Sequence, residues 1–121
     1  MTIHNILVVD DSKTELLYIS SILKQQGYVV RTAENADETF LRLKEGVPDL
    51  ILMDVIMPGM NGFQLTRKLK HLPEYANVPV IICTSKDQPT DRFWGLKQGA
   101  SDYLTKPVAA EALLAKISAL S

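Results

Sequence analysis

The chain has 121 residues, close to the commonest size of a single domain, so a second full domain is not expected. Hydrophobic residues make up 46% of the chain and charged residues 22%, which is the balance of a globular protein rather than a disordered one. The formal net charge is −1, so no basic excess is present to neutralise the phosphates of a duplex. We therefore expect no nucleic acid as a direct partner.

Cysteine usage and the N-terminal residues bear on the compartment. Cys83 is the single cysteine, so it cannot form an internal disulfide, and its place in an apolar run predicts a buried, inert thiol. The N-terminus lacks a cationic segment followed by an apolar stretch, and no apolar run approaches the roughly 18 residues of a membrane span. We expect a cytoplasmic protein with no membrane insertion.

Five short apolar runs are spaced along the chain. None alternates between apolar and polar residues, a pattern typical of parallel strands whose sheet is covered on both faces. The runs are Ile6 to Val9, Tyr28 to Val30, Leu50 to Met53, Val78 to Cys83, and Tyr103 to Leu104.

Between these runs the apolar residues recur at helical spacing. The expected stripes are Leu16, Ile19 and Leu23; Ala36, Phe40 and Leu43; Leu65, Leu69 and Leu72; Phe93, Leu96 and Ala100; and Leu113, Ile117 and Leu120. Gly27, Gly46 and Gly99 lie where helices are expected to stop. Five strands alternating with five helices predict an α/β fold with right-handed crossovers. We expect one domain over residues 1–121, with no output domain.

Polar residues stand at the ends of four predicted strands. Asp10 and Asp11 follow the first strand, Asp54 the third, Thr84 the fourth and Lys106 the fifth. In open parallel sheets a site lies outside the carboxyl ends of the strands, so the fold should bring these side chains to one edge.

Three carboxylates in one pocket repel each other unless some are protonated or a cation is shared among them. Magnesium, which takes oxygen ligands and keeps several waters, is the simpler answer. His4 and His71 are isolated in the sequence and no cysteine cluster exists, so a zinc site is not expected.

The ammonium of Lys106 and the hydroxyl of Thr84 suit the oxygens of a phosphoryl group. A carboxylate beside magnesium can accept that group, and Asp54 is the better candidate because it stands alone after the central run. Asp10 and Asp11 are then the metal holders. An Asp after a strand can also be a simple helix cap, and either Asp11 or Ser12 could cap a helix beginning near Lys13.

The same residues resemble those of response-regulator receiver domains, the CheY-like family of two-component signalling. This resemblance covers essentially the whole chain and implies a flavodoxin-like five-stranded sheet of order 2-1-3-4-5. The motifs that carry it are Val9-Asp10-Asp11-Ser12, Met53 to Gly62, Thr84-Ser85, and Tyr103 to Pro107.

The resemblance assigns roles at the acidic site. Asp54 would become an aspartylphosphate, taking its phosphoryl group from a sensor histidine kinase. Asp11 would bind Mg²⁺ directly and Asp10 through water, with the backbone carbonyl of Ile56 as a further ligand. The protein would then be a phosphoacceptor that also loses its phosphoryl group, and not an enzyme with a separate substrate.

The resemblance also implies a switch. Thr84 would swing toward the new phosphoryl group and Lys106 would bridge to it, with a cis peptide between Lys106 and Pro107. Tyr103 would turn inward when Thr84 moves and reshape the face made by the fourth helix, fifth strand and fifth helix, where a downstream partner would bind. The alternative is that Tyr103 is a half-buried edge-strand aromatic that does not move.

Three residues depart from the common family pattern. Ser85 stands where small Ala or Gly is more usual, and its hydroxyl could either help at the phosphoryl oxygens or hinder Thr84. Ile56 and Lys86 stand where other members place polar or acidic groups. Since such residues shape water access, the lifetime of the phosphorylated state is open.

A narrower resemblance is to PilH-type stand-alone regulators of type IV pilus twitching and of phototaxis or chemotaxis-like pathways. It rests on Thr84 to Asp91, Trp94-Gly95, and Gln98 to Pro107. Trp94 is either an exposed anchor for a partner or part of the core margin over the fourth helix. We expect a monomer or weak dimer that signals to a motility or taxis protein.

Three other functions were weighed against a signalling switch. A phosphate sink for the same pathway would use the same site. A phosphatase of the haloacid-dehalogenase type, with Asp54 as transient nucleophile, needs a second acid where this chain has Ile56. A flavin-binding flavodoxin needs phosphate-cradling hydroxyls where Asp10 and Asp11 would repel the phosphate.

Overall fold

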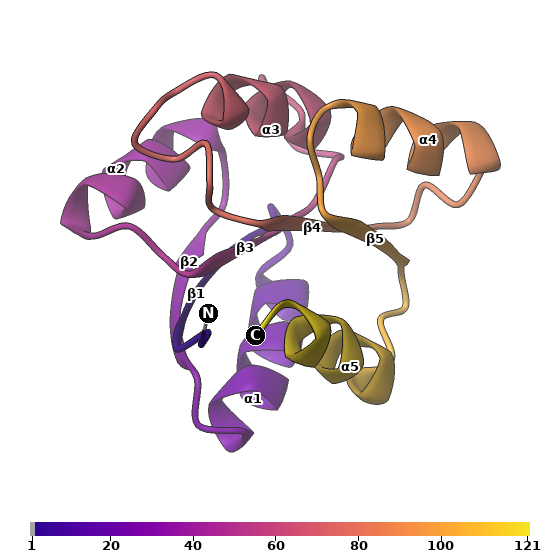
Figure 1. Cartoon of the computed structure of the whole chain (residues 1–121). Helices are drawn as coiled ribbons and strands as arrows, with labels where there is room; N and C mark the ends of the chain where they lie inside the picture. Colours follow the sequence, from indigo (N-terminus) through magenta and orange to yellow (C-terminus); the bar gives the residue numbers. More distant parts are fainter. Residues whose placement is uncertain (1) are drawn as a thin grey trace.

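The computed structural model describes residues 2–121, in which five strands alternate with five helices (Figure 1). All strand pairs are parallel and the sheet order is β2-β1-β3-β4-β5, as predicted. The elements are β1 (Asn5–Val9), α1 (Lys13–Gln25), β2 (Val29–Ala33), α2 (Ala36–Glu45), β3 (Leu50–Met53), α3 (Gly62–Lys70), β4 (Val80–Thr84), α4 (Pro89–Lys97), β5 (Asp102–Thr105) and α5 (Ala110–Leu120).

Helices cover both faces of the sheet. Figure 1 shows α1 and α5 on one side and α2, α3 and α4 on the other. Leu7 and Val9 of β1 pack in the core beneath α2 and α3, whereas Ile6 and Val8 pack in the core beneath α1 and α5. Because successive side chains of a strand point to opposite faces, a sheet covered on both faces needs apolar residues at every position. This is why β1, β3 and β4 are continuous apolar runs.

The second strand differs from its prediction. Tyr28 to Val30 was expected to be a buried run, but β2 lies at the sheet edge and the Val29 side chain is 59% exposed. The edge position explains the difference, because β2 is hydrogen-bonded to a neighbouring strand on only one side. Arg31, in the middle of β2, donates hydrogen bonds to the carbonyl oxygens of Arg42 and Gly46 at the end of α2.

The fourth helix packs through a different face from the one predicted. The expected buried stripe was Phe93, Leu96 and Ala100, yet Phe93 is 64% exposed and Leu96 40%. The buried residue of α4 is Gly95, where an added Cβ would lie 3.0 Å from the ring of Tyr103. The helix thus approaches the sheet too closely for a larger residue at the contact, and its bulky side chains face outward. Ala100 is buried, but it lies beyond the end of α4.

The predicted helix ends at glycine are confirmed. α1 ends just before Gly27 and α4 just before Gly99, and both glycines have positive φ (89° and 110°). The third helix ends earlier than predicted, since Leu72 lies two residues past its end at Lys70. Within residues 2–121, no helix is both long enough and apolar enough to cross a membrane.

Candidate functional site

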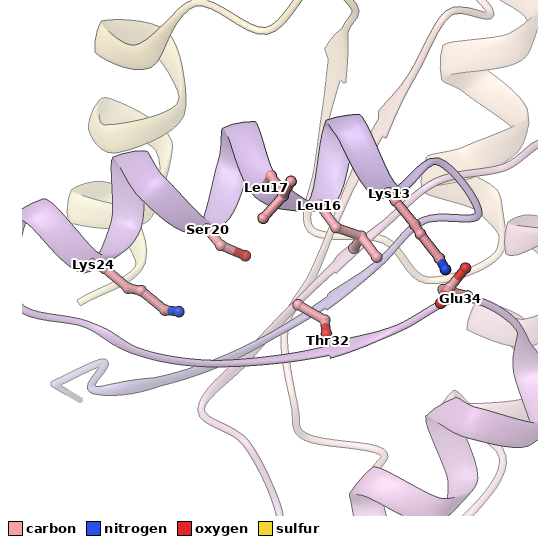
Figure 2. Close-up of a pocket in the computed structure, with 7 residues that line it drawn as sticks. All are labelled: Lys13, Leu16, Leu17, Ser20, Lys24, Thr32 and Glu34. Carbon is pink, nitrogen blue, oxygen red and sulfur yellow. The ribbon is translucent and has the colours of Figure 1, made fainter.

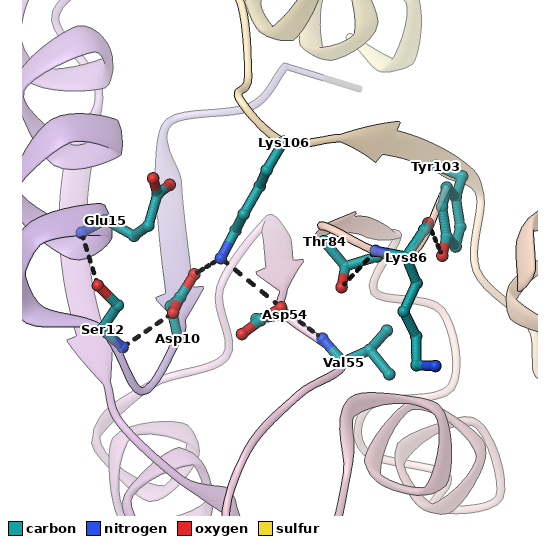
Figure 3. A network of polar contacts seen from close by, with 9 residues as sticks. All are labelled: Asp10, Ser12, Glu15, Asp54, Val55, Thr84, Lys86, Tyr103 and Lys106. Carbon is teal, nitrogen blue, oxygen red and sulfur yellow. Dashed lines mark hydrogen bonds and ion pairs between the residues drawn. The ribbon is translucent and has the colours of Figure 1, made fainter. Parts of the chain in front are cut away.

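Four polar side chains meet at the carboxyl edge of the sheet (Figure 3). Asp10 follows β1 and Asp54 follows β3, while Thr84 is the last residue of β4 and Lys106 follows β5. β1, β3, β4 and β5 are consecutive neighbours in the sheet, so their ends lie side by side. The topology therefore places together residues that are up to 96 positions apart in the chain.

Asp10 is held by the first turn of α1. Its Oδ1 accepts a hydrogen bond of 2.9 Å from the backbone N–H of Ser12, and its side chain is buried. Ser12 is also the N-cap of α1, because its side chain accepts from the backbone N–H of Glu15. Of the two alternatives for the cap, Asp11 and Ser12, the structure selects Ser12, which leaves the Asp11 carboxylate for the site.

Asp54 is a buried carboxylate with an unusual pKa. Burial raises its pKa from about 3.8 to about 6, and the neighbouring charge of Asp10 adds to the rise. Lys106 and the backbone N–H groups of Val55 and Ile56 act in the opposite direction. The Val55 N–H donates to Asp54 Oδ1 over 2.8 Å. Asp54 is thus mostly ionised at neutral pH. Burial and the charge of Asp10 destabilise this ionised form, and a bound cation would stabilise it.

Lys106 lies between the two buried acids. Its Nζ is 2.7 Å from Asp10 Oδ2 and 3.7 Å from Asp54 Oδ1. Burial by itself would lower the pKa of Lys106, but the hydrogen bond to Asp10 and the charge of Asp54 outweigh it and raise the pKa. The ammonium therefore stays charged, and it can reach an oxygen atom placed on Asp54.

Asp11 completes an acidic cluster. One carboxylate oxygen from each of Asp10, Asp11 and Asp54 can be chosen so that all three atoms lie within 4.8 Å of one another. Asp10 and Asp54 are buried, whereas Asp11 is exposed and opens the cluster to solvent. Three carboxylates against the single ammonium of Lys106 leave the site with a net negative charge. The cluster has the hard oxygen donors that Mg²⁺ prefers.

The start of α3 fixes the backbone around Asp54. Asn61 caps this helix in a reciprocal box with Gln64, each accepting from the other's backbone N–H. At Gly62 an added Cβ would lie 2.0 Å from the Asp54 carbonyl oxygen, so only glycine allows this approach. Gly62 belongs to the motif noted in the sequence, but the sequence by itself assigned it no role. Its position directly after a capping Asn was the available signal.

Thr84 and Tyr103 lie on adjacent strands and both contact Lys86. The Lys86 N–H is 3.5 Å from Thr84 Oγ1, and the Tyr103 hydroxyl donates to the Lys86 carbonyl over 2.8 Å. Thr84 is fully buried and Tyr103 is only 3% exposed. The Tyr103 ring is therefore already turned inward in this structure.

The departures from the family pattern lie at the rim. Ser85 and Lys86 are exposed, and the Ile56 side chain is 52% exposed two residues after Asp54. Lys86 Nζ is 3.9 Å from Asp91 Oδ1 on α4. Both side chains are thus open to solvent close in sequence to Asp54 and Thr84, and their effect on water access stays a prediction.

Other predicted residues lie farther from the acids. Trp94 is half exposed on α4. The peptide between Lys106 and Pro107 is cis. Cys83 is buried, which raises the pKa of its thiol to about 12. His4 and His71 are exposed, and neither joins the acidic cluster.

Glu15 is a member of this neighbourhood that sequence reasoning missed. The spacing Ser12 to Glu15 is that of a capping box, in which the Glu side chain would accept from the Ser12 N–H. That N–H is given to Asp10 instead, and the Glu15 carboxylate lies beside the site with its Oε2 buried and unpartnered (Figure 3). Its charge helps to raise the pKa of Lys106.

A separate hollow of about 370 Å³ lies between α1 and β2 (Figure 2). One side is lined by Leu17, Ser20 and Lys24 of α1. The other side is lined by Thr32 of β2 and by Glu34, which comes just after β2. None of the three clustered acids borders it. This hollow is therefore separate from the acidic cluster at the strand ends.

Comparison with known proteins agrees with the geometry of the acidic edge. The response regulator receiver domain family matches residues 6–118. The chain belongs to this family. As a receiver domain it is a phosphoacceptor and not a conventional enzyme, which confirms the resemblance read from its motifs.

Individual relatives extend the comparison. The receiver domain is 50% identical over 115 residues to Protein PilH of Pseudomonas aeruginosa, covering 95% of each chain. It is 40% identical over 116 residues to the response regulator PleD of Caulobacter vibrioides, of which it spans 26%. Among solved structures, the chemotaxis protein CheY4 of Vibrio cholerae superposes with a TM-score of 0.91 at 29% identity, covering 99% of this chain and 100% of that one.

Proposed function

We propose that Asp54 of this receiver domain accepts a phosphoryl group from the phosphohistidine of a sensor histidine kinase. The observation that carries this proposal is the placement of Asp54, which is buried beside Asp10 and Lys106 and has a pKa of about 6. A carboxylate that is ionised at neutral pH but poorly compensated is a competent oxygen nucleophile. Its neighbours supply the charge neutralisation on which phosphoryl transfer depends.

The donor set fits a bound Mg²⁺. Asp10, Asp11 and Asp54 would hold the ion, with the backbone carbonyl of Ile56 as the fourth protein ligand that the family resemblance implies. Three carboxylate oxygens within 4.8 Å are hard donors, and one ammonium does not balance their charge. When bound, Mg²⁺ supplies neutralisation of the charge that spreads over the phosphoryl oxygens.

Three side chains of this site have separate roles in the phosphoryl transfer. An oxygen of Asp54 forms a bond to phosphorus while the bond between phosphorus and the histidine nitrogen breaks, and the electron pair returns to the imidazole. The ammonium of Lys106 moves from Asp10 to a phosphoryl oxygen, because that oxygen carries the new negative charge. The Thr84 hydroxyl donates to a second phosphoryl oxygen after turning from the Lys86 N–H. The phosphoryl group is the only group that moves from the kinase to this protein, and no other reactant is needed.

The proposed output is a change in partner binding at the face of α4, β5 and α5. Tyr103 of β5 connects this face to the site, since its hydroxyl is bonded to Lys86 next to Thr84. Asp102 accepts from Lys116 of α5 over 2.9 Å and lies 3.4 Å from Arg92 of α4, so ion pairs join the three elements. A shift of Tyr103 would therefore disturb all three together.

The pathway we propose is type IV pilus motility or taxis in the cytoplasm, on the strength of the similarity to PilH. The receiver domain would act there through one of its own surfaces. The partner would be a motility or taxis protein that distinguishes the two phosphorylation states.

The test is to incubate the protein with acetyl phosphate and Mg²⁺ and to measure its intact mass. We expect the mass of one phosphoryl group to be added to wild type and not to Asp54→Asn. Beryllofluoride with Mg²⁺ should also change the fluorescence of Trp94, the single tryptophan. Modification of Asp54→Asn, or modification that proceeds equally well without Mg²⁺, would contradict the proposal. Equal capture of cellular partners with and without beryllofluoride would contradict the proposed output.

A further inference from the structure

A basic groove runs along α3 and reaches α4, away from the acidic site. It consists of two adjoining hollows of about 340 Å³ and 420 Å³, which share Arg67 and His71 as lining residues. Trp94 and Lys97 of α4 line the first hollow, whereas the second is lined only by α3 and the turn after it, with Lys68 among its residues. Figure 1 shows these two helices next to each other over the same face of the sheet.

The charges that line this groove have one sign. Arg67, Lys68 and Lys97 are the charged lining residues, and neither hollow is lined by Asp or Glu. Across residues 2–121, no ion pair of the chain uses any of the three. This concentration of positive charge contrasts with the net charge of −1 for the whole chain.

Helix dipoles do not account for all of this charge. Arg67, Lys68 and Lys97 lie in the last turns of α3 and α4, where cations stabilise helix ends. Each helix end carries roughly half a negative charge, so two ends offset only about one of the three positive charges. Lys68 Nζ lies 5.3 Å from the ring centroid of Phe40 on α2, but the groove keeps a positive excess that no carboxylate of the described residues pairs with.

Aromatic and apolar side chains stand beside these cations. Trp94 lines the groove and is 50% exposed, and Leu72 lines its other end. Phe93 is 64% exposed on the same helix, and Lys97 Nζ lies 5.8 Å from its ring centroid. Tryptophan and arginine are two of the residue types that are enriched in protein interface hot spots.

The exposed residues of α4 are the ones that the close packing of Gly95 turns away from the sheet. With Gly95 against Tyr103, the helix cannot rotate to bury Phe93 and Trp94 without driving a Cβ into the Tyr103 ring. The aromatic residues are therefore held outward by the fold. Their exposure is a fixed property of the α4 surface, and not the result of a loosely packed helix.

We propose that the hollow of this groove between α3 and α4 binds an acidic segment of a partner protein, which inserts an apolar side chain beside Trp94 while its carboxylates pair with Arg67 and Lys97. This surface lies on the α3 side of α4, whereas the output face proposed above lies on its β5 and α5 side. The inference does not depend on phosphorylation of Asp54, and it can hold or fail separately.

The test uses a synthetic acetylated peptide that is rich in glutamate and carries leucine at every fourth position. We expect saturable quenching or a spectral shift of Trp94 emission, and affinity that falls as salt is raised. The same peptide with glutamine in place of glutamate should bind at least about tenfold more weakly. Anisotropy of a labelled peptide gives the dissociation constant when the tryptophan itself is changed.

Charge reversal in the groove supplies the matched variants. The double variant Arg67→Glu with Lys97→Glu should weaken peptide binding by about tenfold or more. The control is Lys13→Glu with Lys24→Glu, which makes the same change in net charge on exposed positions of α1. The control should bind within about twofold of wild type, since α1 covers the opposite face of the sheet from α3 and α4 (Figure 1). Circular dichroism checks that each variant is folded.

Four outcomes would overturn the proposal. The first is peptide binding that leaves Trp94 emission unchanged, and the second is equal loss of affinity in the groove variant and the control. The third is no binding of the acidic peptide to wild type. The fourth is saturable binding of ATP or inorganic phosphate at the groove in preference to the peptide, which would assign it to a small anion instead. Trp94→Ala should lower the affinity for the labelled peptide, as measured by anisotropy. An unchanged affinity would contradict the proposed contact between Trp94 and the apolar side chain of the partner.

Discussion

The ammonium of Lys106 is 2.7 Å from Asp10 and 3.7 Å from Asp54, so one cation is shared unequally between two buried acids. Asp10 is the nearer partner in this structure, and Asp54 is the less compensated of the two. This inequality explains why burial and Asp10 prevail over Lys106 and raise the pKa of Asp54. The residue that we propose as the phosphoacceptor is thus the one whose charge is least satisfied.

Stability should fall with rising pH because of Asp54. Its pKa is about 6 in the folded protein and near 3.8 when unfolded, so between these values the folded state binds more protons. The free energy of unfolding then decreases as pH rises through this window, by at most about 3 kcal/mol. Asp54→Asn cannot ionise and keeps an oxygen to accept from the Val55 N–H. We expect it to be more stable than wild type at pH 7 by up to this amount, and equal to it near pH 4.

Urea unfolding without Mg²⁺ at the two pH values measures this difference. Addition of Mg²⁺ should reduce the advantage of Asp54→Asn at pH 7, because a bound cation compensates the ionised carboxylate of wild type. A variant that loses stability relative to wild type as pH rises would show that Asp54 has no raised pKa.

Replacement of Lys106 should lower the free energy of unfolding far more than replacement of a partly exposed lysine that lies at a similar distance from an aspartate. Lys106→Met leaves Asp10 buried without its cation, and we expect the free energy of unfolding at pH 7 to fall by about 2 kcal/mol or more. Lys116→Met is the control, since its Nζ lies 2.9 Å from Asp102 but both side chains are partly exposed. That variant should lose less than about 1 kcal/mol.

Denaturant titration of the two lysine variants distinguishes these cases, and equal losses would contradict the role of burial. The pKa of Asp54 should also rise further in Lys106→Met, because Lys106 is among the groups that lower it. An NMR titration of the Asp54 carboxyl group measures this rise.

Gly62 should not tolerate a side chain. An alanine Cβ would lie 2.0 Å from the Asp54 carbonyl oxygen, so either α3 or the backbone of Asp54 must shift. We expect Gly62→Ala to lower the free energy of unfolding by about 1–3 kcal/mol, although alanine is the better helix former. Phosphorylation by acetyl phosphate should slow as well, since Asp54 moves relative to Lys106. Lys44→Ala, at an exposed position on α2, should change neither measurement, and a Gly62→Ala protein of normal stability would contradict the close approach.

Cys83 should be unreactive in the folded protein. Its thiol is 2% exposed with a pKa of about 12, so almost no thiolate forms at pH 8. We expect a disulfide reagent to label it only as fast as the protein unfolds. Ser85→Cys places a second thiol at an exposed position two residues later and should label rapidly in the same protein. Equal rates for the two thiols would contradict the burial of Cys83.

Much of the site could be predicted because strand ends are easy to locate in this sequence. The apolar runs of β1, β3 and β4 are continuous, so the polar residues that end them stand out. Parallel strands then bring Asp10, Asp54 and Thr84 to one edge whatever the details of packing. The role of Ser12 as cap was left open, since Asp11 has the same preference for that position.

The errors lie where an element has only one neighbour or packs through glycine. The residues of β2 form an apolar run like those of the central strands, and nothing in the local sequence shows that Val29 faces solvent. A helix that packs through Gly95 buries no large residue, so counting apolar spacing on α4 selects the wrong face. In both places the deciding contact comes from another part of the chain.

The sequence by itself determined the alternation of strands and helices and the acids and cations at the strand ends, and its motifs resemble those of receiver domains. The alternation and the strand-end residues follow from periodicity and from residue types, which are local properties. Only the tertiary structure decided that Lys106 sits closer to Asp10 than to Asp54 and that Tyr103 is already inward. It also decided that Trp94 shares a basic groove with α3. These depend on distances between segments that are remote in the chain, which packing sets and local patterns do not encode.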